Sequence, residues 1–333
     1  MLSLINITVI PFLLGALMSV EDVEEWNFGP VYVFQLNKLT KIYVDPKLGI
    51  YLTENVTAMV WCRPKLSLQS IQDILFCHAK TITGRPILSR QIHNWKNNVN
   101  LLLETSIDIN GSKSINFHEG STNIPDHIFK IEFGRQGVQN FKVKEIKKEL
   151  HYYDIITNII DQFNIGSDWS IVERDSMPTH KIESYVISTF MPYEEDTVRA
   201  SKCSTSGVIM YPIDTSYQYN KSEKFFQLRL LPISYIEPTS KNLWMERNRM
   251  ACTQQPQYIM LSNEEWQIDN MFQYSNILNI HDKNRKFTSH THLEGNVYFP
   301  ISTNSVHKFE EDVYFHLLRI EAAREELNTV EYD

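Results

Sequence analysis

The chain has 333 residues, of which 42% are hydrophobic and 22% are charged, a composition typical of globular proteins and not of disordered ones. This length allows roughly one to three domains of about 100–200 residues each. The formal net charge of -8 argues against a global electrostatic attraction to nucleic acid, so we expect no nucleic-acid partner. Eleven glycines and four cysteines are too few for a collagen-like repeat or a disulfide-dense miniprotein.

The first 19 residues carry no charged side chain. The apolar stretch from Ile5 to Met18 is interrupted by polar residues and a proline, and it is too short for a spanning helix of about 20 residues. It predicts a secretory signal peptide over residues 1–19, with cleavage after Ala16 or Ser19; the alternative is a buried N-terminal strand or helix. No later window is apolar over about 18 residues, so we expect a secreted, extracellular chain without a transmembrane segment.

Secretion determines how the cysteines and the asparagines are interpreted. Three pairings of the four cysteines are possible, and we favour Cys62–Cys77 and Cys203–Cys252 because each pair is local in the sequence. The alternative leaves one pair as buried thiols. Three glycosylation sequons follow the expected signal peptide, at Asn55, Asn110 and Asn220.

Most of the chain predicts strands. β-Favouring runs occupy residues 31–34, 42–44 and 58–61, with a turn signal over residues 45–49. Residues 66–78 fit a helix or a strand equally well, and Asn110-Gly111 predicts a hairpin. Further strands are expected over residues 184–190, 207–213, 225–233, 258–261 and 296–301.

Residues 127–166 give the clearest local pattern. Apolar and polar residues alternate over residues 129–133 and again over 141–145, with a glycine-containing turn at 134–137. An amphipathic helix is expected from Glu149 to Ile165, with isoleucines on its apolar face and Asp154, Asn158 and Asp161 on its polar face. The predicted order is therefore strand, turn, strand, single helix.

The last segment, residues 305–333, predicts a C-terminal helix. Phe309, Val313, Leu317 and Ile320 recur at helical spacing, and the intervening positions are rich in glutamate and arginine.

The sequence contains few residues that indicate a catalytic, cofactor or metal site. The sequence contains no G-x-S-x-G, G-x-G-x-x-G, P-loop or H-E-x-x-H motif, so we predict no enzyme activity, no catalytic residue and no cofactor. His290 and His292 lie on one face of an expected strand, and with His281 they could form a metal site. The alternative, which we favour, is two exposed polar residues.

Four lysines form a local basic cluster in this acidic protein: Lys142, Lys144, Lys147 and Lys148. Lys142 and Lys144 alternate along an expected strand and so share one face. Such a patch can engage an acidic partner, and the alternative is a solvated edge strand protected by lysines.

The order of these elements resembles the N-terminal module of vitellogenins and related large lipid transfer proteins. The resemblance covers roughly residues 26–300 and rests on several pieces: the opening residues 26–32, the strands 129–133 and 141–148 with the helix 149–165, and then Cys203, Tyr211, the segment 227–233 and Cys252. No single motif is sharp, and the order of the pieces carries the resemblance.

The resemblance implies a mainly β fold with one α-helix: a large antiparallel barrel-like sheet around the central helix, over residues 20–304, followed by the C-terminal helix. A helix inside a barrel must place its polar face against polar groups or water, and otherwise it would dock externally. Family members exceed a thousand residues and build a lipid cavity from further domains, so this chain resembles the truncated vitellogenin-like proteins of insects.

The resulting functional expectation is a secreted, non-enzymatic binding module for a cell-surface receptor or partner protein, with possible residual lipid binding. The resemblance also implies receptor recognition through basic residues, for which the lysine cluster is the candidate. The alternative is a small extracellular lipid carrier that uses the barrel or the apolar face of the C-terminal helix; protection of that face would remove its support. An unrecognised hydrolase ranks last.

Overall fold

The computed structural model describes seventeen stretches of the chain, and every structural statement below concerns them alone. They are residues 10–13, 30–45, 47–64, 73–83, 87–94, 99–105, 127–134, 137–144, 150–164, 184–196, 201–212, 229–231, 242–254, 258–261, 264–281, 286–299 and 302–327.

These residues form sixteen strands and one helix. The first nine elements are β1 (Ile10–Leu13), β2 (Pro30–Asp45), β3 (Ile50–Pro64), β4 (Asp73–Thr83), β5 (Ile87–Asn94), β6 (Val99–Thr105), β7 (His127–Gly134), β8 (Gly137–Val143) and α1 (Leu150–Phe163). The remaining strands are β9 (Ser184–Asp196), β10 (Ser201–Pro212), β11 (Arg229–Leu231), β12 (Asn242–Gln254), β13 (Tyr258–Leu261), β14 (Glu264–His281), β15 (Lys286–Phe299) and β16 (Ser302–Ala322).

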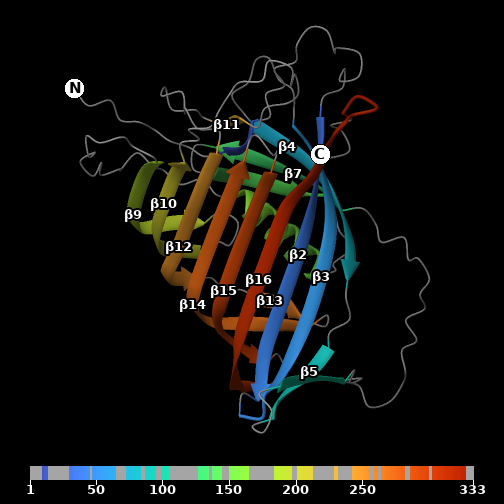
Figure 1. Cartoon of the computed structure of the whole chain (residues 1–333), viewed down its shortest axis with the longest axis vertical. Helices are drawn as coiled ribbons and strands as arrows, with labels where there is room; N and C mark the ends of the chain where they lie inside the picture. The colour runs from blue at the N-terminus through green and yellow to red at the C-terminus, as the bar shows by residue number, and fades with distance from the viewer. Residues whose placement is uncertain are drawn as a thin grey trace.

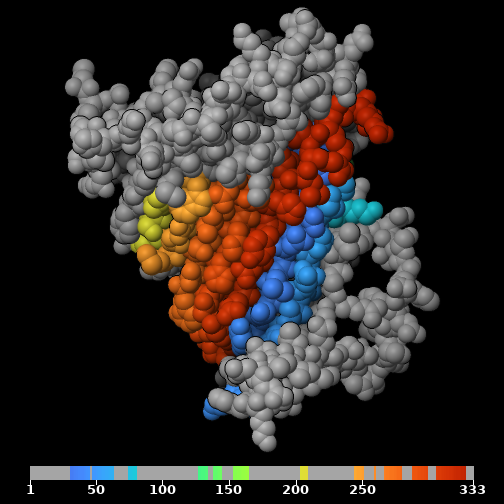
Figure 2. All heavy atoms as spheres, viewed as in Figure 1, coloured from blue at the N-terminus to red at the C-terminus, as the bar shows by residue number. Residues whose placement is uncertain are grey.

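One antiparallel sheet of fourteen strands organises the fold. Its main path runs β8-β7-β4-β3-β2-β16-β15-β14-β12-β10-β9, with β13, β5 and β6 attached to the side. Figure 1 shows the long strands side by side with the helix behind them, and Figure 2 shows the outer face of the same sheet. Strands β8 and β9 end the path and do not pair with each other, so the described sheet is curved but not closed. The expected mainly β architecture around one helix is confirmed.

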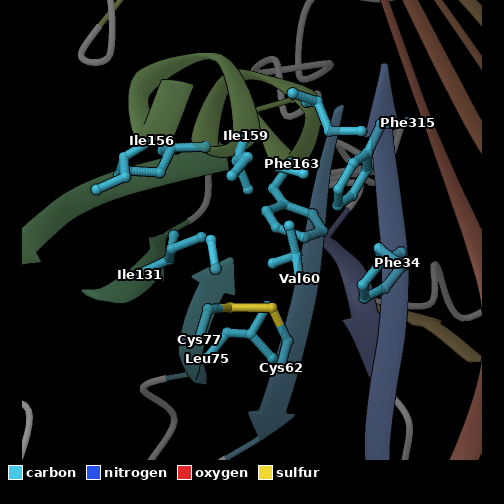
Figure 3. Close-up of a cluster of buried hydrophobic side chains, with 14 of the residues drawn as sticks. Phe34, Val60, Cys62, Leu75, Cys77, Ile131, Ile156, Ile159, Phe163 and Phe315 are labelled. Atoms are coloured by element: carbon cyan, nitrogen blue, oxygen red, sulfur yellow. A yellow bond between two sulfur atoms is a disulfide. The ribbon is translucent and has the colours of Figure 1, made fainter. Parts of the chain in front are cut away.

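The helix α1 packs its apolar face against the inner face of the sheet. Ile155, Ile156, Ile159, Ile160 and Phe163 are at most 1% exposed and belong to the main hydrophobic cluster. In Figure 3 the helix side chains point toward strand residues that include Phe34, Val60 and Phe315. Phe163 meets the Phe315 ring edge-on, at 5.0 Å between ring centroids. The predicted helix and its apolar face are therefore confirmed.

The turn between β2 and β3 lies at the predicted turn signal. The Asp45 carboxylate accepts hydrogen bonds from the amides of Lys47 and Leu48, at 3.0 and 3.1 Å. Gly49 then adopts a φ of 65°, in the left-handed region that glycine enters without a steric penalty. This local chemistry fixes the hairpin and hence the register of both strands.

The predicted C-terminal helix is wrong. Residues Ser302–Ala322 form β16, which pairs with β15 on one side and β2 on the other. The segment assigned to a separate C-terminal unit is thus a central strand of the sheet. Spacings of four residues fit a helix, but they also fit one face of a strand, because four is a multiple of the strand period of two.

Part of the expected signal peptide lies within the described residues. Ile10–Leu13 form β1, which pairs antiparallel with β11. Signal-peptide cleavage stays a prediction. The predicted hairpin at Asn110-Gly111 falls outside the described residues. No helix in the described parts of the chain has the length and apolar character needed to cross a membrane.

Candidate functional site

The described part of the expected basic patch lies at the end of β8, a terminal strand of the main sheet. Lys142 and Lys144 are both exposed and share the outward face, whereas Phe141 and Val143 pack inward against the main hydrophobic cluster. Lys144 donates its amide to the Ile128 carbonyl at 2.9 Å, which ties β8 to β7 at this level. Lys147 and Lys148 lie outside the described residues. The structure therefore brings two of the four predicted lysines together.

The neighbouring strand places a third lysine on this side of the sheet, but its side chain is buried. Lys130 lies directly opposite Lys142 in the β7–β8 pair, and its ammonium is 3.7 Å from the Glu132 carboxylate. Asn140 also donates to Glu132, at 3.4 Å. Like charges placed opposite each other destabilise a strand pair, so Glu132 offsets part of the local positive charge. Among the described residues, no carboxylate lies within ion-pair distance of the Lys142 or Lys144 ammonium.

The polar face of the helix meets buried polar groups of the sheet, as the sequence analysis required of a helix inside a barrel. Lys38 of β2 is 1% exposed and forms ion pairs with Asp154 of the helix and with Glu311 of β16, the latter at 3.0 Å. Thr40 donates to the same Glu311 carboxylate at 3.0 Å. Burial by itself lowers the pKa of Lys38, but the two carboxylates outweigh it and hold the pKa above its ordinary value. A charged lysine therefore joins α1 to two strands.

A second set of buried polar contacts holds the other end of the helix. Gln162 donates to Thr291 at 2.9 Å and accepts from Ser289 at 2.8 Å, both on β15. Tyr274 of β14 donates to the Asp161 carboxylate at 2.9 Å, and Arg247 of β12 donates to the Asn164 carbonyl at 2.6 Å. Buried polar groups that find partners in this way specify one docking geometry for the helix. The sequence pattern indicates the polar face of the helix but not these partners on the strands.

The apolar residues offered as a lipid-binding face are core residues of β16. Phe309 and Val313 are 1% and 0% exposed, and Leu317 and Ile320 are partly buried against the main cluster. Their protection removes the support for a lipid site formed by an amphipathic C-terminal helix. The inner face next to α1 is likewise filled by packed side chains.

His290 and His292 converge on one carboxylate. Asp312 of β16 lies opposite His292, and its Oδ1 atom is 3.0 Å from His290 Nε2 and 2.9 Å from His292 Nδ1. Burial by itself raises the pKa of Asp312, but the two hydrogen bonds outweigh it and the net shift is downward. Among the described residues, no group of three histidine, cysteine or acidic side chains could hold a metal ion. The side chain of His281 lies outside the described residues.

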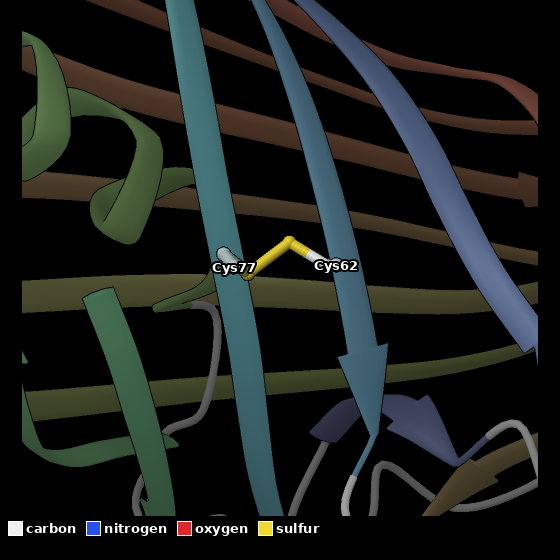
Figure 4. Close-up of a disulfide and its surroundings, with 2 residues drawn as sticks. All are labelled: Cys62 and Cys77. Atoms are coloured by element: carbon white, nitrogen blue, oxygen red, sulfur yellow. A yellow bond between two sulfur atoms is a disulfide. The ribbon is translucent and has the colours of Figure 1, made fainter. Parts of the chain in front are cut away.

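Two of the four cysteines form a cross-strand disulfide. Cys62 of β3 and Cys77 of β4 are directly opposite each other, with 4.2 Å between their Cα atoms, and the bond crosses between the two strands (Figure 4). Both residues are fully buried in the main hydrophobic cluster. Cys203 also takes part in a disulfide. Its neighbour Lys202 pairs with Thr253, but the side chain of Cys252 is not described, so the Cys203–Cys252 pairing stays a prediction.

One of the three sequons can be placed. Asn55 lies on β3 with an exposed side chain, between the buried residues Glu54 and Val56. Asn110 and Asn220 fall outside the described residues. Glycosylation of all three stays a prediction.

Comparisons with known proteins find only distant similarity, and only to solved structures. No protein-family model matches the chain, and no curated protein matches it. Five chains of solved structures match, among them lipovitellin, from a structure that describes lipid–protein interactions in that protein. The TM-score is 0.43 and the sequence identity 10%, over 90% of this chain and 26% of the lipovitellin chain. This chain thus spans about a quarter of lipovitellin, and the likeness is too distant to say anything of function.

Proposed function

We propose that the chain is a secreted, non-enzymatic binding module of vitellogenin type that recognises an acidic protein partner. The observation that carries the proposal is the pair of exposed lysines at the end strand β8, with Lys142 on its outward face and Lys144 directly after its last residue. The opposite face of β8 packs against the main hydrophobic cluster. The two charges are therefore presented on a rigid element, which favours recognition over a loose, solvated loop.

An acidic partner follows from the charge of this surface. A local excess of positive charge in a protein of net charge -8 attracts a negatively charged surface and steers its approach. In the sequence, residues 142–149 carry four lysines and two glutamates, a net charge of +2. A cell-surface receptor or a partner chain with an aspartate- and glutamate-rich segment is the class of partner that fits.

Lipid carriage is the weaker alternative. The described inner face of the sheet holds the helix and two sets of buried polar contacts, and the apolar residues of β16 are packed in the core. A lipid bound by this chain would have to occupy another surface. We therefore keep lipid binding outside the proposed function.

The test uses the whole secreted chain and an immobilised synthetic peptide of alternating aspartate and serine as the acidic probe. The Lys142→Glu, Lys144→Glu double variant should associate on the order of tenfold more slowly at low salt, and the difference should shrink as salt is added. Lys47→Glu is the control for charge reversal away from β8, because Lys47 is exposed on the distant β2–β3 turn. Equal losses in the two variants, or none in the double variant, would reject the proposal.

A further inference from the structure

The Asn55 sequon lies on the same outward face as the His290–Asp312–His292 cluster. Asn55 pairs with Leu39 across β3 and β2, Leu39 pairs with Asp312 across β2 and β16, and Asp312 pairs with His292 across β16 and β15. These four residues form one row across four adjacent strands. Since neighbouring strands lie about 4.8 Å apart, Asn55 is roughly 10 Å from Asp312.

A second row runs beside the first, two residues along each strand. Thr57, the last residue of the sequon, pairs with Asn37, which pairs with Tyr314, which pairs with His290. Thr57 donates to the Asn37 side-chain oxygen at 3.1 Å, and Gln35 donates to the same oxygen at 3.2 Å. The sequon and the histidine cluster are therefore connected by one polar outer surface, whose strands β16, β2 and β3 lie side by side in Figure 2.

Tyr314 presents an open aromatic face toward the sequon. Tyr314 is 49% exposed, and its ring stacks on His290, with 4.1 Å between ring centroids and 3° between ring planes. His290 is on β15, so the stacked face of the tyrosine points toward β15 and the other face points toward β2, where Asn37 and Leu39 lie. Tyr314 therefore adds exposed apolar surface close to the Asp312 carboxylate on this outward face.

We propose that Asn55 carries an N-linked glycan whose first sugars lie across β2 on a seat formed by Leu39, Tyr314 and Asp312. The inference rests on the secretion that the proposed function includes, because only a secreted chain meets the glycosylation machinery. A pyranose ring has C–H groups on its faces and hydroxyls on its rim. The faces pack on Tyr314 and Leu39, and the rim hydroxyls donate to the Asp312 carboxylate.

The covalent link makes this weak contact effective. A sugar attached at Asn55 remains next to Tyr314 at a high local concentration, so a single stacking contact is enough to seat it. The histidine pair holds Asp312 in place through both hydrogen bonds and leaves Oδ2 for a sugar hydroxyl. The His290–Asp312–His292 cluster, which the sequence suggested as a metal site, would thereby position the glycan.

The experiment expresses the full chain, with its own N-terminus, in cultured mammalian cells. Glycopeptide mass spectrometry of the secreted protein measures occupancy at Asn55, and peptide-N-glycosidase digestion of the native protein measures how quickly that glycan is released. Tyr314→Thr, which keeps a β-branched residue in the strand, should speed release about fivefold, the effect expected when one stacking contact is lost. Leu39→Thr should act in the same direction and provides a second variant on another strand.

Two controls separate a seat from a general loss of structure. Tyr314→Phe keeps the ring and should release the glycan at the wild-type rate, as should Tyr153→Ala, which removes a tyrosine 50% exposed on the helix. Equal release from wild type and both seat variants would overturn the seat, and an unmodified Asn55 in secreted protein would overturn the whole inference while leaving the lysine-based function intact. A chain retained inside the cell would remove the secretion on which both proposals depend.

Discussion

Replacing Lys38 with methionine should remove the cation that joins the helix to the sheet. The side chain of Lys38 is 2% exposed, and its two partners, Asp154 and Glu311, are 17% and 3% exposed. Methionine fills a similar volume without a charge, so Lys38→Met leaves two carboxylates facing each other with no cation between them. Glu311 retains the hydrogen bond from Thr40, and Asp154 retains contact with solvent and the amide of Asn158 at 3.3 Å.

The expected loss is about 3–5 kcal/mol in the free energy of unfolding, the cost of breaking a buried ion pair by removing one partner. Because domains are stable by only about 5–15 kcal/mol, this is a large share of the total. Most of the cost falls on Glu311, whose charge is the more deeply buried. Glu311→Gln in the Lys38→Met background should therefore restore part of the stability, since it removes the uncompensated charge and keeps a hydrogen-bonding side chain.

Urea unfolding followed by tryptophan fluorescence measures these differences, with Lys41→Met as the control. Lys41 lies on the same strand but faces outward, over the Tyr51 ring at 5.9 Å, and its replacement should cost only about 0.5 kcal/mol. A loss below about 1 kcal/mol for Lys38→Met would refute the reasoning. A double variant no more stable than Lys38→Met alone would refute it as well.

Three further perturbations test separate parts of the fold. A Cβ atom at Gly295 would lie 2.2 Å from the Asn270 carbonyl oxygen, so Gly295→Ala should cost about 1–3 kcal/mol or more by thermal unfolding, whereas Asn296→Ala should leave stability within about 0.5 kcal/mol. Replacing both Cys62 and Cys77 with serine opens a link between residues 15 apart and should lower stability by about 3 kcal/mol; an unchanged urea midpoint would count against a structural role for the bond. Because folding lowers the pKa of Asp312, its ionised carboxylate stabilises the fold above the unfolded pKa of about 3.9, and this stabilisation is lost as the pH falls through the folded pKa. The stability difference between wild type and Asp312→Asn should therefore be present at about pH 6 and fade below about pH 4. A difference that does not change with pH would show that the histidine contacts do not act on the carboxylate.

The local patterns of the sequence predict much of the fold. Strict alternation over residues 129–133 and 141–143 gives β7 and β8, because each strand turns its apolar side chains into the core and its polar side chains to the opposite face. The isoleucines of residues 155–160 recur at the helical period and give α1. Asp45 and Gly49 specify the turn between β2 and β3 through chemistry that acts within a few residues.

The local sequence pattern does not predict the C-terminal strand β16. Glu311 occupies an inward position between Phe309 and Val313, so the alternation expected of a strand is broken at its centre. The ion pair with Lys38, 273 positions away in the sequence, and the hydrogen bond from Thr40 make that position acceptable for a carboxylate. The register also shifts between Leu317 and Arg319, which returns Ile320 to the inner face and completes a spacing that looks helical.

Local sequence patterns also predict the candidate sites only in part. The sequence places Lys142 and Lys144 on one face because they are two residues apart on a strand, and it places His290 and His292 together for the same reason. It cannot show that Asp312 contacts both histidines or that Asn55 lies in the same row as Asp312 and His292, because both facts depend on the order of β15, β16, β2 and β3 in the sheet. Strand order depends on pairing between residues far apart in the chain, and the local sequence pattern does not predict it.

The most direct test of the proposed function is a lysine footprint of the secreted chain with and without the acidic probe peptide. Amine acylation followed by peptide mass spectrometry gives the reactivity of each lysine at low salt. The account predicts that Lys142 and Lys144 are protected by the probe, while Lys47 on the distant turn reacts equally in both samples. Protection of Lys47, or unchanged reactivity of Lys142 and Lys144 when the probe is bound, would contradict it.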